Sequence, residues 1–232
     1  MTMRMTPRKV SPMSPEATRT RPAEGAAARP RERNRRGEGS RLSDEIVAAA
    51  AALLDETGHE EAVTLRAVAR HIGIAAPSIY AHFADRQAIL LAVVQDAFAD
   101  LDQQLRSAIA SAGEDPVHRL HAVCDAYLTF AATRPQRYRV MFGGAWNATA
   151  ALDSRAVTDD EVGALGQDAL AVLVTELEAC VAAGRSNSTD AVSDAVALWL
   201  GLHGLAHQQA VSAAFPWPVD IRQRLVTSLA HL

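Results

Sequence analysis

The stretch "TLRAVARHIGIAAPSIYAHF", residues 64–83, holds two short apolar patterns on either side of Gly73. A helix-turn-helix unit needs a small residue where its two helices cross and a turn residue that tolerates positive φ. Ala69 and Gly73 meet these two requirements. The unit also needs apolar positions that pack the helices together, and these fall at Val68, Ile72, Ile74 and Ile79. The spacing therefore predicts a helix-turn-helix unit.

The residues around this unit predict further helices and no strand. Before it, "SDEIVAAAAALLDETG" starts with a Ser43 cap and two acids and ends at Gly58. After it, an amphipathic pattern extends from about Arg86 to Gly113. Further helices are predicted over residues 115–134, 135–142, 159–183, 188–215 and 220–232, with a loop to about Thr158. The sequence predicts an all-α protein of about nine helices.

The charge of the chain is divided unevenly. Residues 1–41 contain 11 Lys and Arg against 4 Asp and Glu, whereas the remainder contains 12 against 23. Residues 1–40 are rich in Pro, Arg, Ala, Ser and Gly and lack periodicity, which predicts a disordered basic arm. Two interpretations stay open for it: a solvated tail, or an arm that binds nucleic acid.

Several classes of protein are disfavoured. No apolar run reaches the roughly 18 residues of a membrane span, and the start lacks the apolar core of a secretory signal, so we expect a cytoplasmic protein. Cys124 and Cys180 fit buried thiols. His203 and His207 lack acidic or cysteine neighbours at ligand spacing, so we expect no metal and no cofactor. A catalytic cluster is absent from the sequence, and we expect no enzyme.

From about Arg41 to Val94 the sequence resembles the DNA-binding domain of the TetR family of transcriptional regulators. The stretch "VARHIGIAAPSIYAHFADRQAILLAV" carries the resemblance, and its most specific part is the cluster Tyr80, His82 and Phe83. A Trp-x-x-x-His-Gly stretch, residues 199–204, resembles the regulatory domain of a family subgroup. The resemblance implies a three-helix DNA-binding domain at residues 41–86. It also implies a helical-bundle domain for ligand binding and dimerisation at residues 87–232.

The resemblance implies that a recognition helix, about Ala75 to His82, enters the major groove of an operator. The residues expected at the DNA are Arg41, Thr64, Arg66, Ala76, Pro77, Ser78, Tyr80, His82 and Arg86. The family often has Ser or Thr where this chain has Ala75, which removes a helix cap. The recognition helix also lacks Arg, Lys, Asn and Gln, which read bases bidentately. We therefore expect the basic arm to supply affinity through counterion release.

The resemblance implies a homodimer, formed through the last two helices, that binds a palindromic operator. The expected interface residues are Leu198, Leu202, Leu205, Gln209, Ile221, Leu225 and Leu229, with Gly201 and Gly204 either at this interface or packed within the chain. A pocket for a small apolar or aromatic effector is expected among Tyr127, Phe130, Tyr138, Met141, Phe142, Trp146, Trp199 and His203. The favoured function is a repressor released by this effector. The alternatives are an activator, an effector-independent DNA-binding protein and, less favoured, a helical-bundle enzyme.

Overall fold

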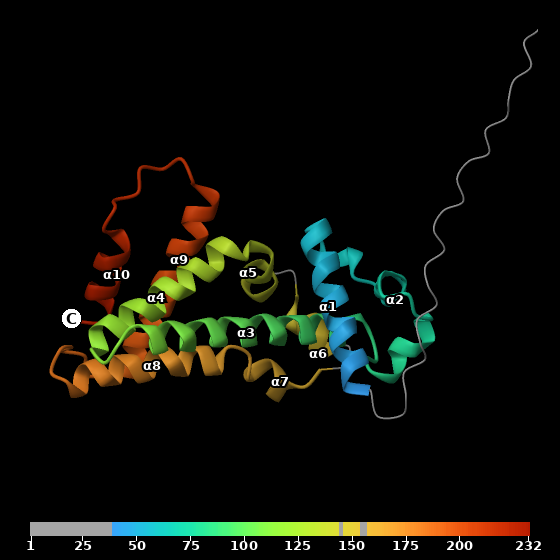
Figure 1. Ribbon diagram of the computed structural model, residues 1–232, viewed down its shortest axis with the longest axis horizontal. Coiled ribbons are helices and arrows are strands. Elements are labelled where there is room, and N and C mark those ends of the chain that lie inside the picture. The colour runs from blue at the N-terminus through green and yellow to red at the C-terminus, as the bar shows by residue number, and fades with distance from the viewer. Residues whose placement is uncertain (1–38, 144–145, 154–156) are drawn as a thin grey trace, which may run out of the picture. The chain divides into compact units, whose positions relative to one another are not determined.

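The structure, a computed structural model, describes residues 39–143, 146–153 and 157–232. All regular structure in these residues is helical (Figure 1). The helices are α1 (Gly39–Thr57), η1 (Glu60–Ala62), α2 (Leu65–His71), η2 (Ala76–Ala81), α3 (Arg86–Ser111), α4 (Pro116–Thr133), α5 (Pro135–Phe142), α6 (Ala148–Asp153), α7 (Asp159–Gly163), α8 (Gln167–Ala182), α9 (Ala191–Val211) and α10 (Ile221–Leu229), where η denotes a 3-10 helix. None of the described helices is long and apolar enough to span a membrane. The all-α prediction is confirmed.

Helix α1 starts earlier than its sequence predicted. We expected Ser43 to cap it, but the helix begins at Gly39. An ion pair between Arg41 and Glu45, one turn apart at 3.4 Å, stabilises this additional turn. The C-terminal end agrees with the prediction, because Gly58 has a φ of 70° and its amide donates to the carbonyl of Leu54.

Helix α3 links two hydrophobic cores. Asp85 caps it by accepting a hydrogen bond from the amide of Ala88 at 3.0 Å. The N-terminal part of α3, through Ile89 and Val93, packs in a core with α1, α2 and η2. Its C-terminal part, through Leu101 and Leu105, packs in a second core with α4, α8 and α9. One continuous helix therefore contributes to both cores.

The segment between α5 and α8 differs from the sequence prediction. The expected loop contains helix α6, and the single helix expected over residues 159–183 is divided into α7 and α8. A capping box between Thr158 and Glu161 starts α7. The break follows from Gly166, which has a φ of 76° and cannot continue an α-helix. At this point the chain also passes close to Phe98, because a Cβ on Gly166 would lie 2.8 Å from the ring.

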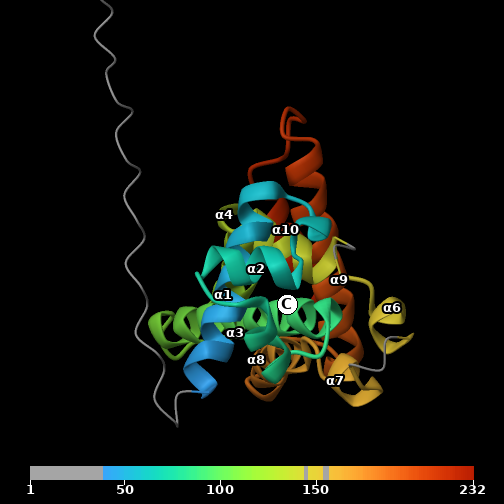
Figure 2. The same cartoon turned by 90° about the vertical axis from the view of Figure 1, so that its right-hand side faces the viewer.

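The last helices pack against each other within the chain. Helices α9 and α10 lie side by side (Figures 1 and 2). A Cβ on Gly201 of α9 would lie 2.7 Å from Leu229 of α10, so this glycine allows a close approach inside the chain.

Arg119 of α4 donates to the buried carboxylate of Glu176 on α8 at 2.7 Å. Cys124 and Cys180 are free and buried, as expected.

Candidate DNA-binding surface and ligand pocket

The turn between α2 and η2 has the geometry that the sequence predicted. Gly73 has a φ of 70°, and the amide of Ile74 donates to the carbonyl of Ala69 at 2.9 Å. Ala69, Val68 and Ile79 are buried at the contact between the two helices. Ile72 and Ile74 pack against the same core and are partly buried. The residues 64–83 therefore form a helix-turn-helix unit.

The expected recognition helix is short and is a 3-10 helix. It comprises Ala76–Ala81, with Pro77 in its first turn. Ala75 precedes it in an extended conformation and has no polar side chain to cap it, as the sequence indicated. The fixed φ of Pro77 and the absence of a capping side chain are both compatible with the tight first turn of this 3-10 helix. The helix buries Ile79 and exposes Pro77 and Ser78.

Tyr80 of η2 is a large aromatic residue that is 62% exposed. It follows directly after the fully buried Ile79. A tyrosine that is mostly in solvent adds little to the core, so its packing role is small. The exposure of Tyr80 is compatible with the phosphate contact that the resemblance implies, and this contact stays a prediction. His82 at the end of η2 is half-buried.

The start of α2 carries two more of the residues expected at the DNA, Thr64 and Arg66. Thr64 is exposed and accepts a hydrogen bond from the amide of Ala67 at 3.1 Å. This bond orients the N-terminus of α2, whose amides attract phosphate oxygens. Arg66 is exposed on the first turn. Arg41 on α1 is also exposed.

Arg86 makes a contact that the sequence did not suggest. Its Nε donates to the carbonyl of Val63 at 3.1 Å, and its Nη2 lies 3.5 Å from the carboxylate of Glu60. These contacts join the start of α3 to the segment between η1 and α2. The phosphate contact stays a prediction, and to make it the guanidinium would have to turn away from Glu60.

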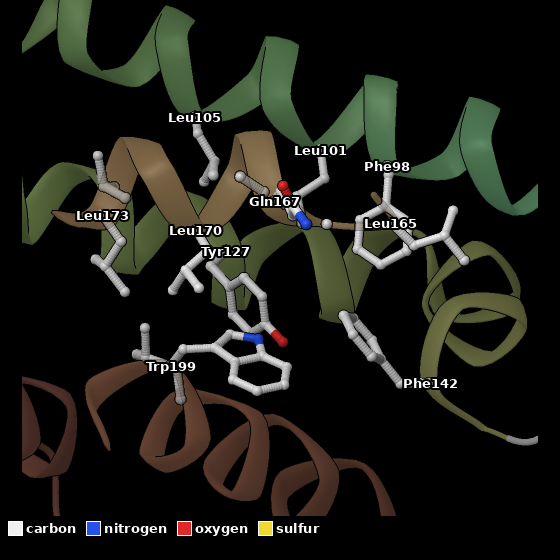
Figure 3. Close-up of a pocket in the computed structure, with 14 residues that line it drawn as sticks. Phe98, Leu101, Leu105, Tyr127, Phe142, Leu165, Gln167, Leu170, Leu173 and Trp199 are labelled. Atoms are coloured by element: carbon white, nitrogen blue, oxygen red, sulfur yellow. The ribbon is translucent and has the colours of Figure 1, made fainter. Parts of the chain in front are cut away.

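The second candidate site is a cavity of about 300 Å³ between α3, α4, α8 and α9 (Figure 3). Most of its wall consists of aliphatic and aromatic side chains. Its lining residues are Phe98, Leu101, Leu105, Val123, Tyr127, Phe142, Leu165, Gly166, Gln167, Ala169, Leu170, Leu173, Trp199 and Leu202. Of the described residues that line it, none is Asp, Glu, Lys, Arg or His. Such a cavity suits an apolar ligand.

Three of the eight residues expected at a ligand, Tyr127, Phe142 and Trp199, line this cavity. Tyr138 and His203 lie behind its wall and contact Tyr127. The other three lie elsewhere: Phe130 is fully buried in the core, Met141 packs against both cores, and Trp146 packs beside α6.

Tyr127, Tyr138 and His203 form a polar cluster beside the cavity. The hydroxyl of Tyr138 lies 2.7 Å from Nδ1 of His203 and 3.2 Å from the hydroxyl of Tyr127. The hydroxyl of Tyr127 is 3.4 Å from the same Nδ1. Burial raises the pKa of both tyrosines, and burial, with a smaller effect of His207, lowers the pKa of His203. All three groups are therefore held neutral at pH 7.

The residues that the sequence analysis missed are mainly aliphatic. It selected large aromatic side chains, but α3 and α8 contribute mostly Leu and Ala. Phe98, Leu101 and Leu105 are spaced by three and four residues, which places them on one face of α3. On α8, Ala169 and Leu170 lie four and three residues before Leu173, which places the three on one face. The periodicity would have found both faces, although it does not distinguish a cavity wall from a filled core.

The expected dimer interface needs a correction. Leu198, Leu202 and Leu205 of α9 are buried in the core of their own chain, so they do not form an exposed surface. Leu200 and Val211 of the same helix are 55% and 63% exposed. The expectation for these leucines failed because both faces of α9 are apolar, and hydrophobicity alone did not indicate which face is inside.

Comparisons with known proteins agree with this architecture. Residues 46–93 match a family model described as bacterial regulatory proteins, tetR family, and residues 120–232 match one described as tetracyclin repressor-like, C-terminal domain. No curated protein matches the chain.

Solved structures show the same fold. A protein with unknown function from Rhodococcus sp. RHA1 is 25% identical, with a TM-score of 0.67 over 88% of this chain and 95% of its own. The fatty acid degradation regulator FadR from Bacillus halodurans is 14% identical, with a TM-score of 0.63 over 85% and 97%. The TetR family regulator PfmR from Thermus thermophilus is 20% identical, with a TM-score of 0.53 over 80% and 96%.

Proposed function

Because the chain belongs to the TetR family of transcriptional regulators, we propose that it is a repressor that an apolar or aromatic effector releases from a palindromic operator. It is a DNA-binding transcription factor and not an enzyme. The observation that carries the proposal is the position of α5, whose side chains contact the cavity, the long helix α3 and the end of α1. We assign DNA binding to residues 41–86, effector binding and dimerisation to residues 87–232, and the cytoplasm as the place where it meets DNA.

The C-terminal end of α5 contacts the cavity. Phe142 lines it and packs edge-on against Phe98 of α3, with ring centroids 5.6 Å apart. Tyr138, one turn earlier, bonds to His203 of α9. A ligand that enters the cavity has to share space with the ring of Phe142. Its binding therefore biases the position of α5.

The other contacts of α5 reach the DNA-binding region. Arg137 donates to the carboxylates of Asp96 and Asp100 on α3. Arg139 donates to the carbonyl of Gly58, at the end of α1, at 2.8 Å. A displacement of α5 thus pulls on α1 and α3, which both pack in the core beneath the helix-turn-helix unit. Couplings between such sites are typically about 1–3 kcal/mol, or roughly 5- to 150-fold in affinity.

The coupling is tested with Arg139→Ala. Operator DNA is first selected from random duplexes, where a palindrome with fixed half-site spacing is the expected product. Naphthalene then serves as the effector probe. We expect wild-type protein to lose operator affinity when naphthalene binds, and Arg139→Ala to bind naphthalene but to lose less affinity. Arg185→Ala, which removes an exposed arginine that pairs with Asp115 on another part of the bundle, is the matched control. Full release in the Arg139 variant would contradict this route.

We propose that the dimer uses the outer face of α9, with α10 beside it. Leu200, Gly204 and Val211 share one face of α9. Among the described residues, none lies within 4 Å of a Cβ placed on Gly204, so a second helix has room to approach there. Glycine inside a helix costs about 1 kcal/mol relative to alanine, which a close contact between helices would offset. Leu200→Glu is expected to give monomers in sedimentation analysis, whereas Val219→Glu, at a fully exposed position between α9 and α10, should leave dimers.

We also propose that the basic arm, residues 1–40, supports DNA binding; its residues 1–38 lie outside the described residues. Residues 42–90 contain only 3 Arg against 7 Asp and Glu, so the helix-turn-helix domain itself attracts DNA weakly. Deletion of residues 1–36 should weaken operator binding and flatten its dependence on salt concentration, because fewer counterions are released. An unchanged salt slope would exclude the arm from the complex.

A further inference from the structure

The cavity restricts the ligand by size and polarity. Its volume is about 300 Å³, and an engineered apolar cavity of roughly 150 Å³ holds one benzene molecule. The cavity therefore fits a molecule of about two rings. Its walls are formed mainly by leucine, phenylalanine and tryptophan side chains, as Figure 3 shows. Such walls favour the apolar groups of a ligand and offer few hydrogen-bonding partners.

The cavity also restricts the charge of the ligand. A charge transferred from water into an apolar site is strongly destabilised unless an opposite charge pairs with it. Of the described lining residues, none is ionised at neutral pH. The neighbouring His203 is kept neutral by burial, which lowers its pKa. An uncharged ligand is therefore favoured over a carboxylate or an amine.

The polar cluster determines which hydrogen-bonding group the ligand needs. The short 2.7 Å contact joins the Tyr138 hydroxyl to Nδ1 of His203, and a phenol is the natural donor to a neutral imidazole. This bond occupies Nδ1. The hydroxyl of Tyr127 is left with the oxygen of Tyr138 at 3.2 Å, which is long for a bond between two hydroxyl groups.

Trp199 adds a second donor at the same place. Its indole lies beside Tyr127 in the cavity wall (Figure 3), and Trp199 opposes the rise that burial causes in the pKa of Tyr127. The indole nitrogen only donates. Gln167, at the edge of the cavity, donates its amide to the carbonyl of Gly163 at 2.6 Å. The hydroxyl of Tyr127 is thus a donor whose best available acceptor would be a ligand oxygen.

We propose that the cavity binds an uncharged, two-ring-sized apolar molecule with a carbonyl-type oxygen, and that Tyr127 is the specificity-determining residue that donates to this oxygen. The proposal rests on the proposed effector site and specifies its ligand class. Tyr138 and His203 are positioning residues, because their mutual bond leaves the Tyr127 hydroxyl to the ligand. The expected discrimination against an equal-sized hydrocarbon is about fivefold, the value of one net hydrogen bond.

The test uses three probes of one shape with the full chain and without DNA. These are 2-acetylnaphthalene, the isosteric hydrocarbon 2-isopropenylnaphthalene and the anion 2-naphthoate, each titrated by calorimetry at pH 7.5. The ketone should bind about fivefold more tightly than the hydrocarbon. The anion should bind at least tenfold more weakly than the ketone. Equal affinity of ketone and hydrocarbon, equal or tighter binding of the anion, or no binding of any probe would overturn the proposal.

Tyr127→Phe tests the assigned residue. It should still bind the hydrocarbon but should lose the preference for the ketone. Because this variant alters a core position, the infrared carbonyl band of the ketone bound to wild-type protein gives a second measurement. The band should lie at lower frequency than in hexane, and an unshifted band would overturn the hydrogen bond.

Failure here is distinguishable from failure of the proposed repressor. If the ketone binds as expected but leaves operator affinity unchanged, the result supports the proposed ligand class and contradicts the proposed release from the operator. If the anion binds and releases DNA, effector control stands and the ligand class falls.

Discussion

The helix-turn-helix unit and the helical bundle use their buried faces differently. In the unit, several residues expected to bind DNA, such as Thr64, Ser78 and Tyr80, are exposed, and the core below holds them in place. In the bundle, the residues that line the cavity are themselves part of the core, such as Leu101 and Tyr127. Stability and function therefore reside on separate side chains in the first region and on shared side chains in the second.

The largest expected effect is at Ile79, which is fully buried under η2. Ile79→Ala removes three carbons from a packed site, and comparable core substitutions cost about 2–5 kcal/mol. Because η2 loses its anchor, operator binding should also be lost. Urea unfolding followed by circular dichroism gives the first quantity and fluorescence anisotropy with operator DNA the second. Ile109→Ala, at a partly buried site in the bundle, should cost less and preserve DNA binding. An Ile79 variant as stable as wild type would contradict the separation.

The next effect is at Gly166, where the cavity wall turns. Gly166→Ala introduces a Cβ at positive φ, which costs about 1–2 kcal/mol, and places it 2.8 Å from Phe98. Gly184→Ala is a close control, because its φ of 67° imposes the same strain with open space around the Cβ among the described residues. The Gly166 variant should be less stable in thermal unfolding than the control. It should also bind 2-acetylnaphthalene more weakly. Equal behaviour of the two variants would show that the contact with Phe98 is unimportant.

The same difference between the regions explains how much the sequence could predict. The helix-turn-helix unit follows from local rules: a turn glycine, a small residue and apolar positions at fixed spacing identified Gly73, Ala69 and Ile79. In the bundle, the sequence predicted the longer helices but missed α6 and the break between α7 and α8, and it did not predict how the helices pack. Whether Leu198 faces inward depends on where α4 and α8 lie. A cavity is even less accessible from sequence, because it depends on what fails to fill the space between several helices.

A smaller effect, confined to binding, is expected at Tyr80. Tyr80→Ala removes a side chain that is 62% exposed, so the free energy of unfolding should stay within about 0.5 kcal/mol of wild type. Operator affinity should fall about tenfold, which corresponds to roughly 1.4 kcal/mol. Tyr80→Phe should lose only the part due to the hydroxyl. An unchanged affinity in the alanine variant would remove Tyr80 from the DNA surface.

The smallest expected effect concerns protonation in the bundle. Burial lowers the pKa of His203 below its ordinary value of 6.5, and the nearby His207 contributes. Between the lowered pKa and 6.5, the unfolded chain binds a proton that the folded chain does not. Stability therefore rises with pH in this window and is lost as the pH falls through it. The carboxyl groups with lowered pKa values, Asp115, Glu161 and Asp190, titrate below their ordinary values of 3.8 and 4.5, so they act at more acidic pH.

His203→Asn tests this origin, since asparagine keeps a neutral polar group near the hydroxyl of Tyr138. Wild-type protein should show a lower urea midpoint at pH 5 than at pH 7.5, and the variant should show a smaller difference. His207→Asn removes the smaller of the two causes that lower the pKa of His203, so it should reduce the difference only slightly. If His203→Asn retains the whole pH dependence, then the protonation that weakens the fold occurs elsewhere. In that case the polar cluster beside the cavity would tolerate a charged imidazole, and the preference for uncharged ligands would have to come from the apolar walls alone.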